Sequence, residues 1–173
     1  MSKTSLLVSL LLCAAVGTAS AGGQAGSIGV GAQYQLSGIG GLSVNYDAGL
    51  FHVGGSLGFA DPQGPTPATF QLAGRFYYHV HHSAFADFGL GGSIGFASVP
   101  NGMAPNTTRN TDVFLEPGFE IRAFLSSNVA LSATAGIVIG AADAGGVAIA
   151  GSTLGGTGGP LFDAGVGIHY YFY

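Results

Sequence analysis

Charged residues are scarce in this 173-residue chain, and their scarcity excludes most classes of soluble protein. Only 7% of the residues are charged, against about 25% in ordinary globular domains. A soluble all-β domain of this size needs a charged exterior, which this composition does not supply. Four Lys and Arg residues in all, with a net charge of −4, also argue against nucleic-acid binding, which requires a basic surface.

Long hydrophobic runs are missing as well. The nearest candidate, residues 129–151, is interrupted by Asp143 and is rich in Gly, Ser and Thr. A membrane-spanning helix needs roughly 20 consecutive apolar residues, so any insertion of this chain into a membrane must use strands.

Cysteine is almost absent, and the one thiol, Cys13, lies in a segment with the features of a secretory signal. Lys3 gives a short positive region, and an apolar stretch leads to an A-x-A cleavage site formed by Ala19 and Ala21. The alternative, a retained anchor, is disfavoured because the apolar stretch is too short to span a bilayer.

We therefore expect two parts, a signal peptide over residues 1–21 and a single domain over residues 22–173. Because the only cysteine falls in the signal, the mature domain is expected to have neither disulfides nor a metal–thiolate site.

What the chain does contain is glycine, 32 residues of it, and regular alternation. Residues 70–82, FQLAGRFYYHVHH, alternate with period two, which is typical of a β-strand with one apolar and one polar face. The apolar face has Phe70, Leu72, Phe76, Tyr78 and Val80. The polar face has Gln71, Arg75, Tyr77, His79 and His81.

Turn-forming residues divide the domain into eight such segments, which we expect to be strands. They cover residues 27–36, 41–47, 50–59, 69–80, 84–98, 112–125, 128–141 and 161–173. Joints after the second, fourth and sixth segments are tight, and those after the third, fifth and seventh are long; the short SGIG joint is the exception. This predicts an all-β fold, an eight-stranded antiparallel up-and-down transmembrane β-barrel with both termini periplasmic and its long loops extracellular.

The polar row carries the charges of these segments, so it is expected to line the barrel interior. An Arg or Lys facing lipid near the midplane costs roughly 2–4 kcal/mol. Six side chains are then expected to form a lumen charge network: Arg75, Asp87, Glu116, Glu120, Arg122 and Asp163. Eight-stranded barrels are just wide enough for side chains to fill, which favours a plug of ion pairs. The alternative is a gate, in which the charged side chains exchange ion-pair partners and open a narrow path. The inward glycines argue against a completely filled lumen, because they leave room for water.

Pro117 is the one residue that resists this scheme, because proline cannot donate a ladder hydrogen bond. The apolar phase is unchanged across it, so an inserted bulge residue is not expected. We expect a local break in strand pairing there, involving Gly118.

The C-terminal VGIHYYFY resembles the closing strand of bacterial outer-membrane β-barrel proteins. The residues that carry this resemblance are Val166, Ile168, Tyr170, Phe172 and the terminal Tyr173, which extends one residue beyond the usual aromatic end. With the signal peptide and the eight segments, the chain resembles the small eight-stranded barrels of the OmpA-barrel, OmpX and OmpW type. The resemblance implies that the C-terminal strand is read by the barrel-assembly machinery.

Five histidines, among them His52 and His169, raise the question of a metal site. By the alternation, His79 and His81 face inward and His82 lies in a turn. Metal sites need several ligands, and no carboxylate is placed beside these histidines by the sequence. Hydrogen-bonding filler is therefore favoured, and no metal or cofactor is predicted.

A catalytic role is also not expected. His81-His82-Ser83 has the His-x-Ser spacing of outer-membrane lipid A deacylases. It lies at a tight turn that the strand order places in the periplasm, whereas those enzymes work near the outer surface. A His–Ser hydrolase also needs an orienting acid within hydrogen-bond reach of the base, and the sequence places none there.

The favoured interpretation is a non-enzymatic integral outer-membrane barrel with a structural or surface-contact role in the cell envelope. Its partners would be outer-membrane lipid and the secretion and barrel-assembly machineries. A narrow channel or carrier for small apolar molecules is the alternative, and a secreted lipid-binding barrel of the lipocalin kind is opposed by the scarcity of charge and the aromatic terminus.

Overall fold

The computed structural model describes residues 24–35, 40–61, 67–101, 108–142, 146–149, 152–153, 156–157 and 162–173. Its strands are β1 (Ile28–Gln35), β2 (Gly40–Asp47), β3 (Phe51–Ala60), β4 (Thr69–His82), β5 (Ala86–Asn101), β6 (Thr108–Phe124), β7 (Val129–Ile137), β8 (Ile139–Ala142), β9 (Gly146–Ile149), β10 (Ser152–Thr153), β11 (Gly156–Thr157) and β12 (Phe162–Phe172). The predicted signal peptide lies outside the described residues. Within them, no helix is long and apolar enough to cross a membrane.

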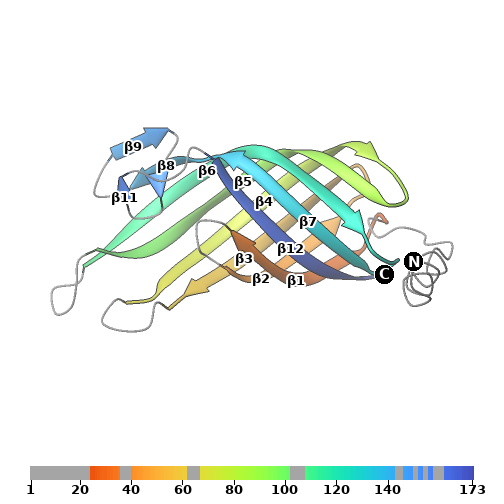
Figure 1. The fold of residues 1–173 in the computed structure, drawn as a ribbon, viewed down its shortest axis with the longest axis horizontal. Coiled ribbons are helices and arrows are strands. Elements are labelled where there is room, and N and C mark those ends of the chain that lie inside the picture. Colours follow the sequence, from red (N-terminus) through yellow and green to blue (C-terminus); the bar gives the residue numbers. More distant parts are fainter. Residues whose placement is uncertain are drawn as a thin grey trace, which may run out of the picture.

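Eight strands close into an antiparallel barrel (Figure 1). The order is β5-β4-β3-β2-β1-β12-β7-β6, and pairing of β5 with β6 closes the sheet on itself. β8 follows β7 along the same neighbour, β6, so the two act as one barrel strand. The eight predicted segments correspond one for one to β1–β6, β7 with β8, and β12, and the predicted fold class is confirmed.

The tight turns lie together at one end of the barrel. They cover residues 48–50, 83–85 and 125–128, and the same end holds the start of β1 and the end of β12, since Ile28 pairs with Phe172 (Figure 1). We call this the tight-turn end and the opposite one the loop end. The last long connection is not a plain loop, because β9 pairs with β8 and β10 pairs with β11 there.

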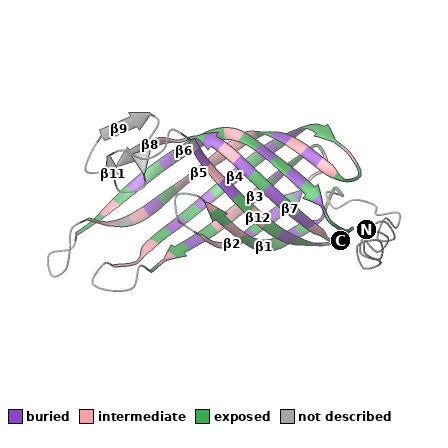
Figure 2. Ribbon diagram, in the orientation of Figure 1, coloured by how far each residue is buried: buried purple, intermediate pink, exposed green. Residues whose placement is uncertain are grey.

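The side chains alternate between the outside and the inside of the barrel, as the banding in Figure 2 shows. Each barrel strand exposes large apolar side chains, for example Val30, Leu42, Leu57, Leu72, Leu90, Leu115, Leu131 and Ile168. The intervening residues are buried or half-buried, and many of them are polar. The expectation that the apolar row faces outward is confirmed, and an apolar exterior on every strand is what a lipid-facing barrel requires.

Pro117 breaks the pairing of β6 on one side only. On the β5 side it pairs in register with Gly92, and the ladder continues unbroken. On the other side, pairing stops at Gly118 with Gly136 and resumes at Leu115 with Ile139. The gap in the ladder explains why β7 and β8 are separate elements, and Gly118 itself is paired on both sides.

Candidate functional site: the charged barrel interior

The interior of the barrel is filled with polar side chains. Those buried on the barrel strands include Ser43, Asn45, Asp47, His52, Gln71, Arg75, His79, Asp87, Asp112, Glu116, Glu120, Arg122, Ser132, Thr134, Asp163 and His169. All six members of the predicted lumen network are among them, but they do not form one cluster. Arg122, Asp87 and Glu120 lie together near the tight-turn end, Arg75 is bound separately, and Glu116 and Asp163 lie towards the loop end.

Arg122 is the centre of the cluster near the tight-turn end. Its Nη2 lies 2.6 Å from Asp87 Oδ2 and 2.7 Å from Asp47 Oδ2, and its Nε lies 4.0 Å from Glu120 Oε1. Nη1 donates a hydrogen bond of 3.1 Å to the Tyr171 hydroxyl. The guanidinium and the three carboxylates are each at most 1% exposed. An unpaired ion in such a dry site costs several kcal/mol. The contacts therefore stabilise the guanidinium and the carboxylates in their buried positions.

Aromatic rings pack against this cluster. The Arg122 guanidinium carbon lies 5.5 Å from the centre of the Phe124 ring and 6.0 Å from that of Tyr171. The two rings meet edge to face at 6.4 Å. Both come from the last residues of their strands, so the rings and the ion pairs together fill the barrel near the tight-turn end.

Arg75 is held by neutral partners rather than by carboxylates. Its Nε and Nη2 donate to Asn45 Oδ1 at 3.1 and 2.7 Å. Further hydrogen bonds go to the Gln33 side-chain oxygen and to the Ser43 hydroxyl. These partners come from β1 and β2, so the guanidinium ties three strands together across the lumen.

The inward glycines do not leave the lumen hollow in this region, because neighbouring side chains occupy the space. A Cβ at Gly54 would lie 2.2 Å from Asn45 Oδ1 and 2.8 Å from Arg75 Nε. A Cβ at Gly29 would lie 2.8 Å from the Tyr171 ring. These glycines therefore let the large polar side chains lie flat against the barrel wall.

Four of the histidines take part in the interior hydrogen bonding. His52 Nδ1 lies 2.9 Å from His79 Nε2, and His52 Nε2 lies 3.4 Å from Glu120 Oε1. His169 Nε2 lies 2.9 Å from the Ser43 hydroxyl. His82, at the mouth of the barrel, lies 2.5 Å from Asp87 Oδ1 through its Nδ1.

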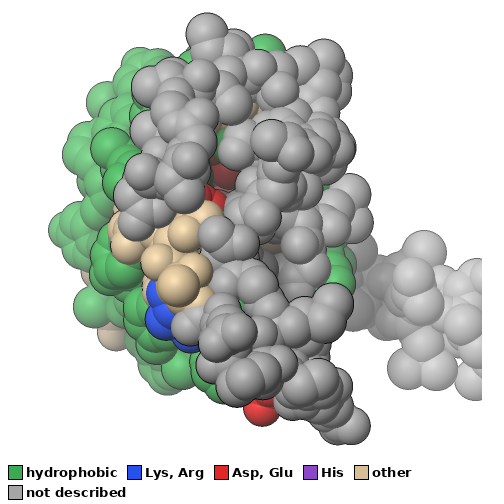
Figure 3. All heavy atoms as spheres, turned by 90° about the vertical axis from the view of Figure 1, so that its left-hand side faces the viewer, with side chains coloured by type: hydrophobic (Ala, Val, Ile, Leu, Met, Phe, Trp, Pro, Cys, Tyr) green, Lys and Arg blue, Asp and Glu red, His purple; other side chains and the backbone are tan. Residues whose placement is uncertain are grey.

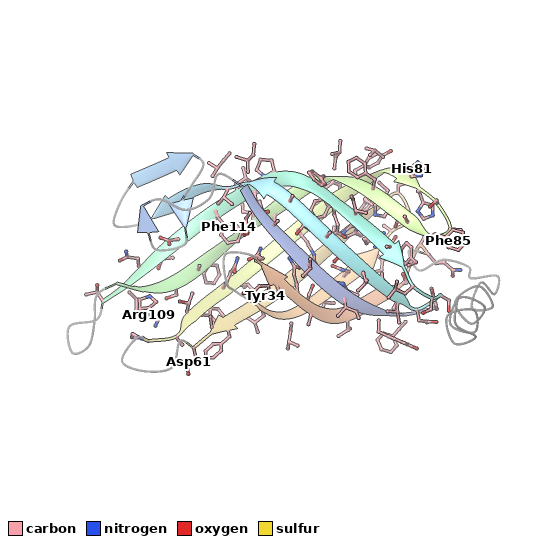
Figure 4. The ribbon with its side chains drawn as sticks, in the orientation of Figure 1. Tyr34, Asp61, His81, Phe85, Arg109 and Phe114 are labelled. Atoms are coloured by element: carbon pink, nitrogen blue, oxygen red, sulfur yellow. The ribbon has the colours of Figure 1, made fainter. Side chains whose placement is uncertain are left out.

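The expectation that His81 faces inward is wrong. The register of β4 against β5 shifts by one residue between His79 and His81, so that His82 stands opposite Asp87. His81 is exposed (Figure 4). A β-bulge of this kind exchanges the two faces of a strand, so it turns His82 towards Asp87 where unbroken alternation would have placed His81.

Ser83 serves the turn and does not form a catalytic pair. Its hydroxyl donates to the Ala86 carbonyl at 2.8 Å and accepts the backbone N–H groups of Phe85 and Ala86. The acid that the sequence did not place beside these histidines is Asp87, which binds His82, but no hydrogen bond joins His82 to Ser83 among the described residues. The hydroxyl is fully used in holding the turn closed.

On the loop side of the interior, Glu116 is bound differently from the carboxylates around Arg122. Glu116 Oε2 accepts a hydrogen bond of 2.9 Å from Ser93, and Glu116 makes no ion pair with an Arg or Lys among the described residues. A cavity of about 10 Å³ lies between Arg75 and Glu116 and is also lined by Gln35 and Thr134. That volume is close to the smallest that holds one water molecule. The space between Arg75 and Glu116 therefore has room for about one water molecule.

Sequence reasoning missed important partners of the two arginines. Asp47 and Asn45, which bind Arg122 and Arg75, were not included in the lumen network, although Asp47 ends the second predicted segment on the same phase as Asn45. His52 is among the histidines expected to act as hydrogen-bonding filler, but the sequence names no partner for it. Asp112 is also buried on the polar row. Continuing the period-two phase to the ends of each segment would have found all four.

The residues of the predicted assembly signal lie on the outside of β12. Val166, Ile168, Tyr170, Phe172 and Tyr173 are exposed. Tyr170 and Phe172 stack with ring centres 4.9 Å apart, and the Tyr173 hydroxyl donates to the Ser127 carbonyl. The C-terminal aromatic group therefore forms part of the outer surface at the tight-turn end.

Comparison with solved structures finds a β-barrel of the same kind. The crystal structure of the N-terminal β-barrel domain of Pseudomonas aeruginosa OprF superposes with a TM-score of 0.62 and 12% sequence identity, over 86% of this chain and 98% of that one. No protein-family model and no curated protein sequence matches the chain. The likeness confirms, at the level of the fold, the resemblance to small eight-stranded outer-membrane barrels.

Proposed function

We propose that this chain is an integral barrel of the bacterial outer membrane, closed internally by its charged plug, with a non-enzymatic structural or surface-contact role in the cell envelope. The observation that carries this proposal is the Arg122 cluster. One guanidinium is bound by two carboxylates within 2.7 Å and approached by a third, all almost fully buried. A barrel whose lumen is filled in this way is built for stability and for display of its loops rather than for passage of large solutes.

The surroundings of the barrel follow from its two surfaces. The apolar exterior would contact outer-membrane lipid, with the termini in the periplasm and the loop end outside the cell. Secretion would use the signal peptide, with cleavage after Ala21, and membrane insertion would use the barrel-assembly machinery. The exposed C-terminal row from Val166 to Tyr173 would be the segment which that machinery recognises.

A gel-shift experiment on outer-membrane fractions tests the proposal. Closed membrane barrels resist detergent until they are heated, so unboiled and boiled samples should migrate differently, and the protein should be found in the outer-membrane fraction. A protein that is recovered in the soluble periplasmic fraction and shows no shift on heating would contradict the proposal.

A narrow channel is the second candidate, and the loop end of the interior supports it. Viewed from that end, acidic side chains are visible in a hollow (Figure 3). Glu116 and Asp163 are buried on this side, and Glu116 lines a water-sized cavity. Such a lining fits small cations better than the apolar molecules considered from the sequence, since buried polar and charged side chains outnumber buried apolar ones in the described interior.

Conductance in planar bilayers separates the two candidates. A closed plug predicts no steady current from the purified barrel. A channel predicts a steady cation-selective current that falls when Glu116 is replaced by Gln, because the substitution removes a negative charge from the lining.

A further inference from the structure

We propose that the mouth of the barrel at the tight-turn end is a binding site for a divalent transition-metal ion of the zinc type, held by His79, His82 and Asp87. One ligand atom of each of the three residues lies within 4.8 Å of the other two. Two imidazoles and one carboxylate, with a position left for water, are a common ligand set for such ions.

The bulge in β4 creates this grouping. By placing one extra residue between His79 and His82, it brings the His82 ring above that of His79, with ring centres 6.2 Å apart and only 10° between the planes. It also sets His82 opposite Asp87. Bulges are conspicuous next to functional sites because they redirect a side chain in this manner.

The hydrogen bonds of His79 fix it in the form that binds metal. Its Nδ1 lies 2.8 Å from the Gly49 carbonyl oxygen, which only accepts, so Nδ1 carries the proton. Its Nε2 lies 3.0 Å from Arg122 Nη2, which only donates, so Nε2 has the lone pair. A histidine whose second nitrogen donates to a backbone carbonyl is the usual arrangement around a bound metal ion.

Asp87 is prepared in a similar way. Arg122 binds its Oδ2 at 2.6 Å, which leaves Oδ1 facing His82 Nδ1 at 2.5 Å. A tetrahedral zinc ion with ligands at about 2.0–2.1 Å keeps them roughly 3.3 Å apart, so His82 Nδ1 must move away from Asp87 Oδ1 by less than 1 Å. The His79 ligand atom lies within 4.8 Å of both. The His82 ring is half exposed and has the freedom to move. Metal binding at His82 Nδ1 would place the proton of the neutral imidazole on Nε2.

The local charge also favours a cation. Asp47, Asp87 and Glu120 place three carboxylates around the single guanidinium of Arg122. An ion bound to His79 Nε2 would replace two contacts of that atom, one with Arg122 Nη2 and one of 2.9 Å with His52 Nδ1. Arg122 Nη2 would keep its contacts with Asp47 and Asp87.

The site can be reached from outside the barrel. A cavity of about 390 Å³ opens at the tight-turn end and is lined by His79, His82, Gly49, Leu50 and Gln24. An ion would therefore enter without passing through the lumen, and in the proposed orientation it would come from the periplasm.

Zinc titration of the purified barrel, prepared in detergent without a polyhistidine tag, tests the proposal. Isothermal titration calorimetry should show one zinc ion bound per chain. His82→Ala should weaken the affinity at least tenfold, since ligand loss exceeds the roughly 10–100-fold effect of losing an outer partner. His81→Ala is the matched control, because it removes the adjacent, exposed histidine, and it should leave the affinity unchanged.

Three results would overturn the proposal. They are the absence of zinc binding by the unmodified barrel, equal weakening by His81→Ala and His82→Ala, and unchanged affinity in His82→Ala. Each variant should first show the heat-dependent gel shift, so that loss of zinc binding is not confused with loss of the fold.

Discussion

The two halves of the barrel interior use their charges differently. Near the tight-turn end, Arg122 is surrounded by carboxylates and aromatic rings, and its side chain is almost fully buried. Towards the loop end, Glu116 is bound by a single serine hydroxyl beside a water-sized cavity. The first half is tightly filled by mutual pairing, whereas in the second Glu116 is held by a hydroxyl and not by a guanidinium.

This difference indicates that the stability of the barrel depends mainly on the side chains near the tight-turn end. A guanidinium with several donors can bind side chains from many strands at once. Arg122 joins β6 to β2, β5 and β12, and Arg75 joins β4 to β1 and β2. Together the two arginines link every barrel strand except β3 and β7. We therefore expect substitutions in the half near the tight turns to destabilise the barrel far more than substitutions near the loops.

Arg122→Met should have the largest effect. It leaves Asp47, Asp87 and Glu120 buried without their shared partner, and breaking a buried ion pair from one side costs about 3–5 kcal/mol. Urea unfolding in lipid vesicles, followed by circular dichroism because the chain has no Trp, would measure the loss. Arg109→Met is the matched control, since Arg109 is exposed at the loop end (Figure 4) and should change the free energy of unfolding by about 1 kcal/mol or less.

Arg75→Met should have the second largest effect. Its partners are an asparagine, a glutamine and a serine, and hydrogen bonds from a charged group to such partners contribute about 1.5–3 kcal/mol. No buried carboxylate loses a close ion pair, so the loss should be smaller than for Arg122→Met under the same conditions. A loss equal to or above that of Arg122→Met would show that carboxylate pairing is not the main source of stability.

Gly54→Ala should destabilise the barrel by about 1–2 kcal/mol, because the new methyl group overlaps Asn45 and the Arg75 guanidinium. Gly55→Ala is a close control on the same strand. A Cβ at Gly55 meets nothing nearer than a backbone oxygen at 3.6 Å, so its unfolding free energy should change by about 0.5 kcal/mol or less. Equal effects at the two positions would contradict the packed interior described here.

Glu116→Gln should have the smallest effect on stability. The amide keeps an acceptor for the Ser93 hydroxyl and removes a buried charge that has no described arginine partner, so the change should stay below about 1 kcal/mol. A loss of 3 kcal/mol or more in the same urea assay would mean that the loop-side half is also organised by ion pairing.

The strands and the face that each presents could be predicted from the sequence, because alternation of period two fixes both at once. Segments with uninterrupted alternation, such as β4 up to His79, were placed correctly. The prediction failed at His81, where one extra residue shifts the register and exchanges the faces. Val80 and the flanking histidines give no sign of that shift, because a bulge depends on how the partner strand β5 is paired.

The partners of the charged side chains could be predicted only in part. Alternation places Asp87, Glu120 and Arg122 inside the barrel. It does not give their positions along the barrel axis or the angle at which the strands tilt. The tilt brings Asp47 on β2 to Arg122 on β6, across the lumen. A local sequence pattern cannot predict a contact between two strands that are not neighbours. The expectation of pairing among the predicted charges holds for Arg122, whereas Arg75 is bound by neutral side chains.

A double-mutant cycle between Arg122→Met and Asp47→Asn tests the central claim most directly. Asp47→Asn keeps an acceptor for the Gly49 backbone N–H, which Asp47 Oδ1 binds at 2.8 Å, and removes mainly the charge that faces Arg122. We predict a coupling of about 1–3 kcal/mol in the free energy of unfolding, and none beyond about 0.5 kcal/mol when Glu116→Gln replaces Asp47→Asn in the cycle. Additive effects of Arg122→Met and Asp47→Asn would contradict the account, because the half near the tight turns would then not be held by paired charges.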